Sequence, residues 1–159
     1  MKHWRPFLIV LMSLAVVHCS SDTPADALHM TVISASRSDT GLDAAVSFSL
    51  NLRNQGDAIL YVAECGALPT PWIQVRSGTE WTLYGGGICE FDEILTANAI
   101  GPGQSIPASV AISGLGSHPG YYRAVILVSD DPKRLVDDEA AGRPQSADEL
   151  ASSASVYLP

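Results

Sequence analysis

The sequence predicts an all-β protein, an antiparallel β-sandwich that follows an N-terminal signal segment. Apolar and polar residues alternate along residues 46–53, which is the period of a half-buried strand and not of a helix. Further short stretches of strand character recur along the chain about every ten residues, separated by Gly- and Pro-rich turns, so that about seven strands are expected. Beyond this fold class, no motif in the chain specifies an activity.

Residues 1–18 form the segment ahead of the predicted fold. Lys2 and Arg5 precede an apolar run over residues 7–17, and this combination is typical of an export signal too short for a permanent membrane span. A buried N-terminal helix is the competing interpretation, but the run has no polar face and would need apolar partners all around. We therefore expect residues 1–18 to be a signal peptide.

Cys19 directly follows this segment, with the aliphatic Val16 three positions ahead of it. The pattern resembles the lipobox of bacterial lipoproteins, in which the thiol receives a diacylglycerol and becomes the mature N-terminus. His18 departs from that pattern, since the family usually has Ala, Gly or Ser there. The resemblance implies a lipid anchor at Cys19 in the cell envelope, in the outer membrane if the cell has one, because Ser20 and not an aspartate follows. Secretion or periplasmic release, with cleavage after residues 25–27, is the alternative.

The mature chain begins with a linker and a group of strands. Residues 19–28 are small and polar and predict a flexible tether. Strand patterning begins near Met30 and continues over residues 46–53 and 58–63, which a turn at residues 54–57 connects.

A hairpin is predicted next, because residues 72–76 and 80–84 flank Ser77-Gly78-Thr79. Gly85-Gly86-Gly87 then predicts a bend toward Cys89, since it lacks the Lys-Ser/Thr of a phosphate-binding loop.

The second half of the chain contains three further strand stretches. Residues 94–100 predict a short strand or an irregular edge, and residues 105–113 predict a strand that Pro107 confines to the edge of a sheet. Residues 121–128 are apolar enough for a central strand.

An acidic stretch over residues 130–152 predicts a solvated loop, in which a helical turn near residues 147–151 is an option. Residues 154–158 then regain strand character and close a domain that spans residues 29–159. A calcium site is a more specific alternative to a solvated loop for the clustered aspartates, but no Asp-x-Asp-x-Asp-Gly pattern supports it. The aspartates concerned are Asp130, Asp131, Asp137 and Asp138.

The order of the strand at residues 46–54, the turn at residues 101–104 and the segment Pro119-Gly120-Tyr121-Tyr122-Arg123 resembles the immunoglobulin-like domains of bacterial envelope lipoproteins. It is also similar, more loosely, to the layout of the intracellular proteinase inhibitors of bacilli. The resemblance covers residues 30–129 and implies the fold more than any activity. In immunoglobulin-like domains a tyrosine at the start of a late strand bonds back to the preceding loop; Tyr122 matches that position best, and Tyr121 is the alternative.

Cys65 and Cys89 remain as a pair once Cys19 is set aside as the lipidation site. An even pair in an exported protein predicts a disulfide, which would stabilise the fold by about 3–4 kcal/mol. Two buried free thiols are the alternative. A metal site is disfavoured because no third or fourth ligand lies at useful spacing.

The charge of the chain argues against nucleic acid as a partner. The formal net charge is −8, and loss of Lys2 and Arg5 with the signal peptide changes it to −10. Nucleic-acid binding depends on neutralising phosphates with Lys and Arg, which an acidic protein opposes. The expected membrane contact is the lipid at Cys19 alone.

No group of side chains has the spacing of a catalytic site, so we expect neither an enzyme nor a cofactor. His29 and His118 have no metal-ligand spacing. The carboxylates within residues 90–93 are sequence neighbours, whereas glycosidases need two carboxylates across a cleft. Residues 116–120 lack the Gly-x-Ser-x-Gly spacing of a serine hydrolase.

A binding or structural role at the cell envelope is therefore the expected function, with an envelope protein, a peptide or a glycan as partner. Trp72, Trp81 and Tyr84 are candidates for an exposed aromatic surface, although core and edge packing would also explain them. Addition of a strand at this hairpin is one mechanism. The alternative is a proteinase inhibitor that inserts the disulfide-braced loop at residues 66–71 into a protease.

Overall fold

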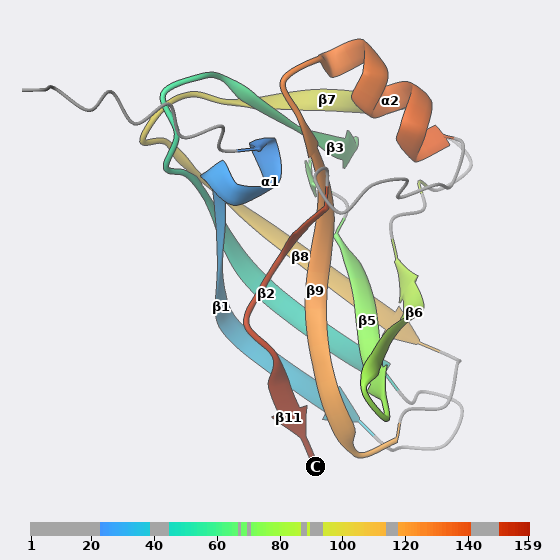
Figure 1. Ribbon diagram of the computed structural model, residues 1–159. Coiled ribbons are helices and arrows are strands. Elements are labelled where there is room, and N and C mark those ends of the chain that lie inside the picture. The colour runs from blue at the N-terminus through green and yellow to red at the C-terminus, as the bar shows by residue number, and fades with distance from the viewer. Residues whose placement is uncertain are drawn as a thin grey trace, which may run out of the picture.

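The computed structural model describes residues 23–38, 45–66, 68–69, 71–86, 89, 94–113, 118–140 and 150–159. Within these residues the chain forms eleven strands and two short helices (Figure 1). All strand pairs are antiparallel, and the strands form one three-stranded and one eight-stranded sheet. The predicted all-β sandwich is confirmed, with more strands than the seven expected because several are very short.

The three-stranded sheet has the order β1-β2-β8. It consists of β1 (Leu28–Ser38), β2 (Ala45–Asn54) and β8 (Ser105–Ser113). Every second residue of β2 is buried, so the alternation read from the sequence directs one face of this sheet into the core. Pro107 lies in an edge strand, as predicted.

The strand β9 (Gly120–Ser129) is the centre of the second sheet. Val125 pairs with Trp72 on one side and with Ser152 on the other, so β9 has partners along both edges. The neighbour on one edge is β5 (Trp72–Ser77), and those on the other are β10 (Leu150–Ser152) and β11 (Val156–Leu158). The strand β3 (Leu60–Cys65) pairs with the end of β9 at Val128 and Ser129. The sheet is completed by β6 (Glu80–Gly86) beside β5, and by β4 (Leu68–Pro69) and β7 (Leu95–Ile100) beside β3.

The main core lies between the two sheets. Its largest fully buried side chains include Phe48 and Leu52 from the first sheet and Ile73, Tyr122 and Ile126 from the second. Residues 124–129 are buried without interruption, which is the pattern of a central strand covered on both faces and confirms the prediction for β9.

The tether predicted over residues 19–28 is wrong from Pro24 onward, because α1 (Pro24–Ala27) and Leu28 of β1 belong to the fold. The Thr23 hydroxyl accepts a hydrogen bond from the amide of Asp26, and Pro24 suits the first turn of a helix. The Ala27 carbonyl accepts a 2.8 Å bond from the amide of Gln55, which ties α1 to the turn after β2. The local composition did not predict that α1 belongs to the fold, because the hydrogen bond that holds it joins residues far apart in the sequence.

The solvated loop predicted over residues 130–152 is also wrong, since α2 (Pro132–Ala140) and β10 lie within it. The Asp131 carboxylate caps the helix by accepting from the amides of Lys133 at 2.9 Å and Arg134 at 3.4 Å. Leu135 is 2% exposed and packs with Ala63 and Leu127 in a second core on the outer side of the sheet. The suggested helical turn at residues 147–151 overlaps β10, and residues 141–149 lie outside the described part of the chain.

The turn between β2 and β3 is organised by Asn54, which is fully buried. Its side-chain nitrogen donates to the carbonyls of Ala58 at 2.7 Å and Ile100 at 2.8 Å, and its side-chain oxygen accepts from the amide of Gly56 at 2.9 Å. Its main chain bonds to the turn at residues 101–104. One side chain therefore joins two turns that are distant in the sequence.

Candidate functional site

The disulfide between Cys65 and Cys89 is present, as predicted, with the two Cα atoms 5.3 Å apart. It connects the end of β3 to the segment that follows β6. Cys19, the predicted lipidation site, lies outside the described residues.

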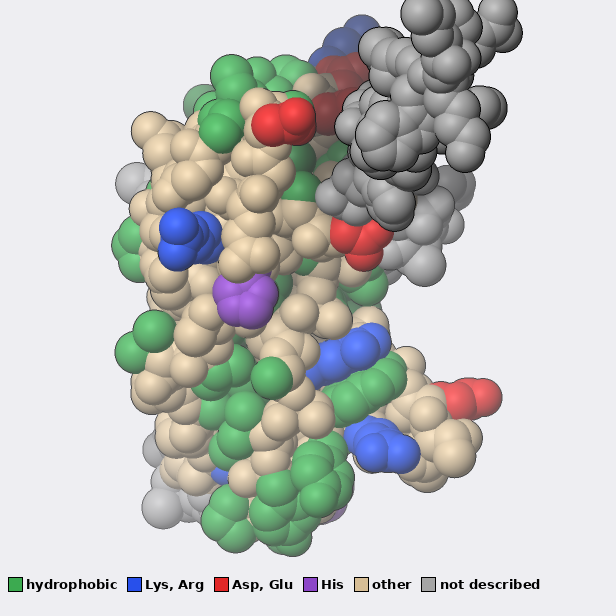
Figure 2. Space-filling view, turned by 60° about the vertical axis from the view of Figure 1, so that its left-hand side comes forward, with side chains coloured by type: hydrophobic (Ala, Val, Ile, Leu, Met, Phe, Trp, Pro, Cys, Tyr) green, Lys and Arg blue, Asp and Glu red, His purple; other side chains and the backbone are tan. Residues whose placement is uncertain are grey.

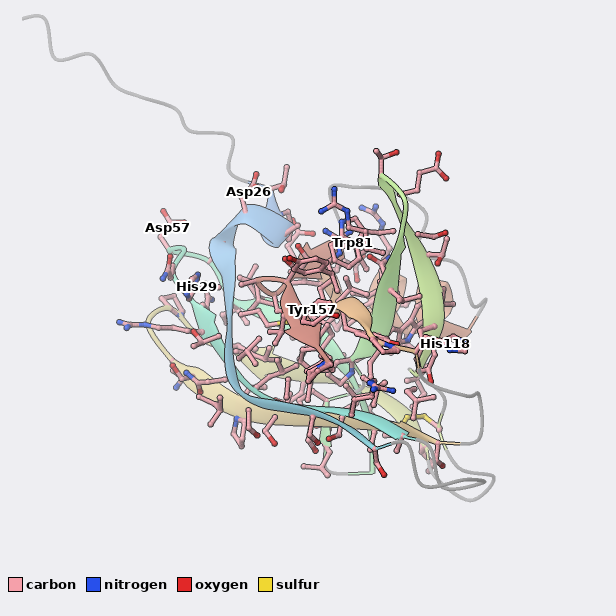
Figure 3. The ribbon with its side chains drawn as sticks, turned by 90° about the horizontal axis from the view of Figure 1, so that it is seen from below. Asp26, His29, Asp57, Trp81, His118 and Tyr157 are labelled. Atoms are coloured by element: carbon pink, nitrogen blue, oxygen red, sulfur yellow. A yellow bond between two sulfur atoms is a disulfide. The ribbon has the colours of Figure 1, made fainter. Side chains whose placement is uncertain are left out.

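The three aromatic residues singled out in the sequence do not share one surface. Trp72 is only 7% exposed. Tyr84 packs against the main core with its ring edge-on to Tyr122, the two centroids 5.7 Å apart. Its buried hydroxyl has no hydrogen-bond partner among the described residues, and burial raises the pKa of Tyr84 above its ordinary value of 10.0. Trp72 alternates with Ile73 and so lies on the same side of the second sheet as Gln74, but it is covered there, whereas Trp81 is turned away from β1 and β2 on that side (Figure 3).

The predicted tyrosine bond is present and belongs to Tyr122. Its hydroxyl donates to the carbonyl of His118 at 2.6 Å, and the ring is 1% exposed. Tyr121, the alternative, is 48% exposed on the opposite face of β9. This bond fixes the start of β9 and therefore the positions of the side chains along it.

The loop proposed for an inhibitor lies beside the disulfide. Leu68 and Pro69 form β4 and pair with Cys65 and Glu64 of β3, and Leu68 is 56% exposed. Residues 67 and 70 lie outside the described part of the chain. An inhibitory role for residues 66–71 stays a prediction.

The structure brings together a set of side chains that we call the outer face: Gln74, Arg76, Trp81, Leu83, Tyr121, Arg123 and Tyr157. Residues paired directly across neighbouring strands point to the same side of a sheet. The pairs that define the outer face are Arg76 with Trp81, Gln74 with Leu83, Gln74 with Arg123, and Tyr121 with Tyr157. The intervening residues Ile73, Val75 and Tyr122 point into the core.

The centre of the outer face is Arg123. Its guanidinium carbon lies 4.4 Å from the centre of the Trp81 ring, and its Nε atom donates to the side-chain oxygen of Gln74 at 2.9 Å. These contacts fix the guanidinium over β5 and β6, although Arg123 belongs to β9. The side-chain amide of Gln74 thus determines which guanidinium nitrogens remain to bind a ligand.

Large apolar side chains are exposed around Arg123. Leu83 is 57% exposed, and Tyr121 and Tyr157 are 48% and 54% exposed with their rings 5.2 Å apart in an edge-on arrangement. In Figure 2, Lys or Arg side chains lie on both sides of a hydrophobic side chain where the surface projects at the lower right. Trp, Tyr and Arg are the residue types that dominate the energetics of protein interfaces.

The outer face is positively charged in an acidic protein. Arg76 and Arg123 are its charged members, and among the described residues neither forms an ion pair with a carboxylate. Partial burial lowers the pKa of Arg123, but a guanidinium stays protonated throughout the physiological range. A partly desolvated cation without a carboxylate attracts an anionic group strongly.

The hairpin β5–β6 gives the outer face an open edge. Gly78 has φ of +62°, as the first central position of a type II′ turn requires, and Ser77 pairs with Glu80. Because hydrogen-bonded and non-hydrogen-bonded pairs alternate from this closing pair, the main-chain groups of Trp81 and Leu83 point away from β5. Within the described part of the chain, β5 is the only strand that pairs with β6.

The other described edges differ in what lies beside them. Pro107 interrupts the donors of β8, and β1 lies close to β10 and β11. The strand β6 contains neither proline nor lysine, but a β-bulge at Tyr84, between the partners of Gln74 and Ile73, limits its regular edge to residues 80–83. Its end is held close to β5 by Gly86, where a Cβ atom would lie 2.7 Å from the Pro71 carbonyl oxygen.

Side chains with catalytic potential are scattered. His29 and His118 lie at opposite sides of the molecule (Figure 3). Within the described ranges, no three His, Cys, Asp or Glu side chains are close enough to hold a metal ion. A hollow of about 430 Å³ lies between α1 and the turn after β2, and Asp57 and Asp130 are among its lining residues.

No helix among the described residues has the length and apolar character needed to cross a membrane.

Sequence reasoning found Trp81 but missed the other members of the outer face. The hairpin motif already implied that Arg76 opposes Trp81 and that Gln74 opposes Leu83, so these neighbours could have been named. No local signal connects Arg123 to Gln74, because 49 residues separate them.

Comparison with known proteins does not assign the chain to a family. No protein-family model and no curated protein matches the sequence. Among solved structures, it is similar at 12% identity and a TM-score of 0.35 to a β-glucosidase from Kluyveromyces marxianus in complex with glucose. That match covers 83% of this chain and only 14% of the glucosidase.

Two further solved structures are similar at the same level. A CARDB domain from Pyrococcus furiosus, in complex with di-metal ions, has 15% identity and a TM-score of 0.35, with 86% of this chain and 94% of that domain covered. An alkylpurine DNA glycosylase from Pseudomonas fluorescens, bound to DNA, has 14% identity and a TM-score of 0.38, with 86% and 32% covered. Likenesses this loose identify neither a family nor a ligand for this chain.

Proposed function

We propose that this protein is an exported, lipid-anchored binding module that captures an extended peptide segment of a partner protein at the free edge of β6. The supporting observation is an edge strand that, among the described residues, pairs with β5 alone and lies beside a surface of Trp, Tyr, Leu and Arg side chains. An added strand would bond to the main-chain groups of Trp81 and Leu83, and its alternate side chains would lie on the outer face.

The lipid anchor is the second part of the proposal. The lipobox-like pattern ends at Cys19, and the described fold begins at Thr23, so a lipidated N-terminus would leave a short spacer between membrane and domain. Cleavage after Ala27 would remove α1 and its hydrogen bond to Gln55, which favours processing at Cys19 over release of a chain that begins at Leu28. The domain would then work outside the cytoplasm, where Cys65 and Cys89 oxidise.

The variant Leu83→Pro tests whether a partner strand binds at the free edge of β6. The amide of Leu83 faces away from β5, so Leu83→Pro preserves the internal ladder but removes a donor that an incoming strand needs. Leu83→Ala is the matched control, because it removes the same side chain and keeps the amide. Peptides selected on the wild-type protein from a random displayed library serve as probes, and calorimetry measures their affinity.

We expect Leu83→Pro to weaken peptide binding at least tenfold relative to Leu83→Ala, with unchanged circular dichroism. Binding should also slow hydrogen exchange at the amides of Trp81 and Leu83. Equal affinity of the two variants, or unchanged exchange at both amides, would contradict capture at this edge.

A further inference from the structure

We infer that the segment captured at β6 is acidic, and that it has a carboxylate-bearing residue opposite Trp81, within reach of Arg123, and an apolar residue opposite Leu83, two positions away. This inference rests on the proposed strand addition and names the class of peptide that the site accepts.

The position of the Arg123 guanidinium is the first step. Arg123 belongs to β9 and is separated from β6 by β5, yet its guanidinium carbon lies 4.4 Å from the centre of the Trp81 ring. The arginine therefore carries its positive charge across the sheet to the strand that has the free edge. An added strand would run about 4.8 Å from β6, so its outward side chains reach the same place.

The geometry of the guanidinium is the second step. Gln74 accepts the hydrogen bond from Nε at 2.9 Å, which leaves the two terminal nitrogens as donors. Two parallel donors match a carboxylate, which Arg binds in a bidentate manner. Arg76 is the cross-strand partner of Trp81, and its Nε donates to the carbonyl of Gly78 at 3.1 Å, so a second cation lies at the turn end of the same hairpin.

The spacing along β6 is the third step. Trp81 and Leu83 are successive outward residues, so an added strand places side chains two positions apart opposite them. The first meets the cations of Arg123 and Arg76, and the second meets Leu83, which is 57% exposed. The accepted segment therefore carries an acidic and an apolar residue separated by one residue.

Charge also argues against a second copy of this chain as the occupant. Pairing of β6 with β6 of another molecule would bring two sets of Arg76 and Arg123 to one junction, while Glu80 alternates with Trp81 and points to the opposite face of the strand. Like charges at that distance disfavour association. An acidic partner has no such penalty at this edge.

Three synthetic peptides test the inference. They share a threonine-rich, strand-forming sequence with one isoleucine, and the residue two positions from it is glutamate, glutamine or lysine. We expect the glutamate peptide to bind the wild-type protein at least tenfold more tightly than the glutamine peptide, and the lysine peptide to bind weakest. Added salt should reduce this preference.

Arg123→Gln should abolish the preference for glutamate over glutamine, whereas Arg53→Gln, an exposed arginine on β2 of the other sheet, should leave it unchanged. If the wild type binds the glutamate and glutamine peptides equally tightly, and Leu83→Pro binds neither, the preference for an acidic segment is overturned. Edge capture itself would remain supported by that result. Binding of the glutamate peptide that Leu83→Pro does not weaken would overturn the edge capture itself. Equally tight binding of polygalacturonate, or dimerisation in the absence of peptide, would also overturn the inference.

Discussion

Replacement of Asn54 is the sharpest test of how the fold is held together. Asn54→Ala removes three side-chain hydrogen bonds at a position with no exposure, and it leaves the amide of Gly56 and the carbonyls of Ala58 and Ile100 without that partner. Water can replace the bond to Ala58, which is exposed, but not the bond to the buried carbonyl of Ile100. At about 1 kcal/mol for each bond, and more for a buried group left unpaired, we expect a loss of about 3 kcal/mol.

Urea-induced unfolding followed by tryptophan fluorescence measures this loss. A domain of this size is stable by about 5–15 kcal/mol, so the midpoint should fall clearly while the slope stays unchanged. Gln55→Ala is the control, since Gln55 is exposed and uses only its main chain, and its effect should lie within about 0.5 kcal/mol. A loss below about 1 kcal/mol for Asn54→Ala would refute the reasoning from these bonds.

Asn54→Asp separates hydrogen bonding from side-chain volume. The new carboxylate would face the carbonyl oxygens of Ala58 and Ile100, so its folded-state pKa would rise above the unfolded value of about 3.9. The variant should therefore approach the wild type below about pH 4 and lose stability relative to it as the pH rises. If the stability difference between Asn54→Asp and the wild type does not change with pH, the assignment of the Asn54 side-chain nitrogen as the donor to these carbonyls would be contradicted.

Three further predictions concern other parts of the chain. Tyr84→Phe should stabilise the fold by about 1 kcal/mol in urea unfolding, because it removes a buried hydroxyl without a described partner. Since burial raises the pKa of Tyr84, the wild type loses stability as the pH rises above 10.0, and its deficit relative to Tyr84→Phe should widen there. Reduction of the Cys65–Cys89 bond, which spans a sequence separation of 24, should lower the free energy of unfolding by about 3 kcal/mol. An unfolding free energy that does not change when reductant is added would contradict this stabilising role. Cys19→Ala should abolish incorporation of labelled fatty acid and release the protein from membranes; an unlabelled wild type would contradict lipid anchoring.

The sequence by itself determined the strands, the hairpin and the disulfide. An alternation with a period of two is a local pattern, so β2 could be located from residues 46–53 alone. Gly78 specified the hairpin because few residues adopt a positive φ at that position of the turn. With Cys19 set aside, two cysteines remained, and the prediction that Cys65 pairs with Cys89 is confirmed.

Only the tertiary structure decided which side chains form the outer face. The contact of Arg123 with Gln74 and Trp81 depends on β9 lying beside β5, which no local pattern encodes. The helix α2 was equally hidden, because its buried side chain Leu135 has its partners in β3 and β9. Local conformation follows from neighbouring residues, whereas a binding surface follows from the order in which distant strands pair.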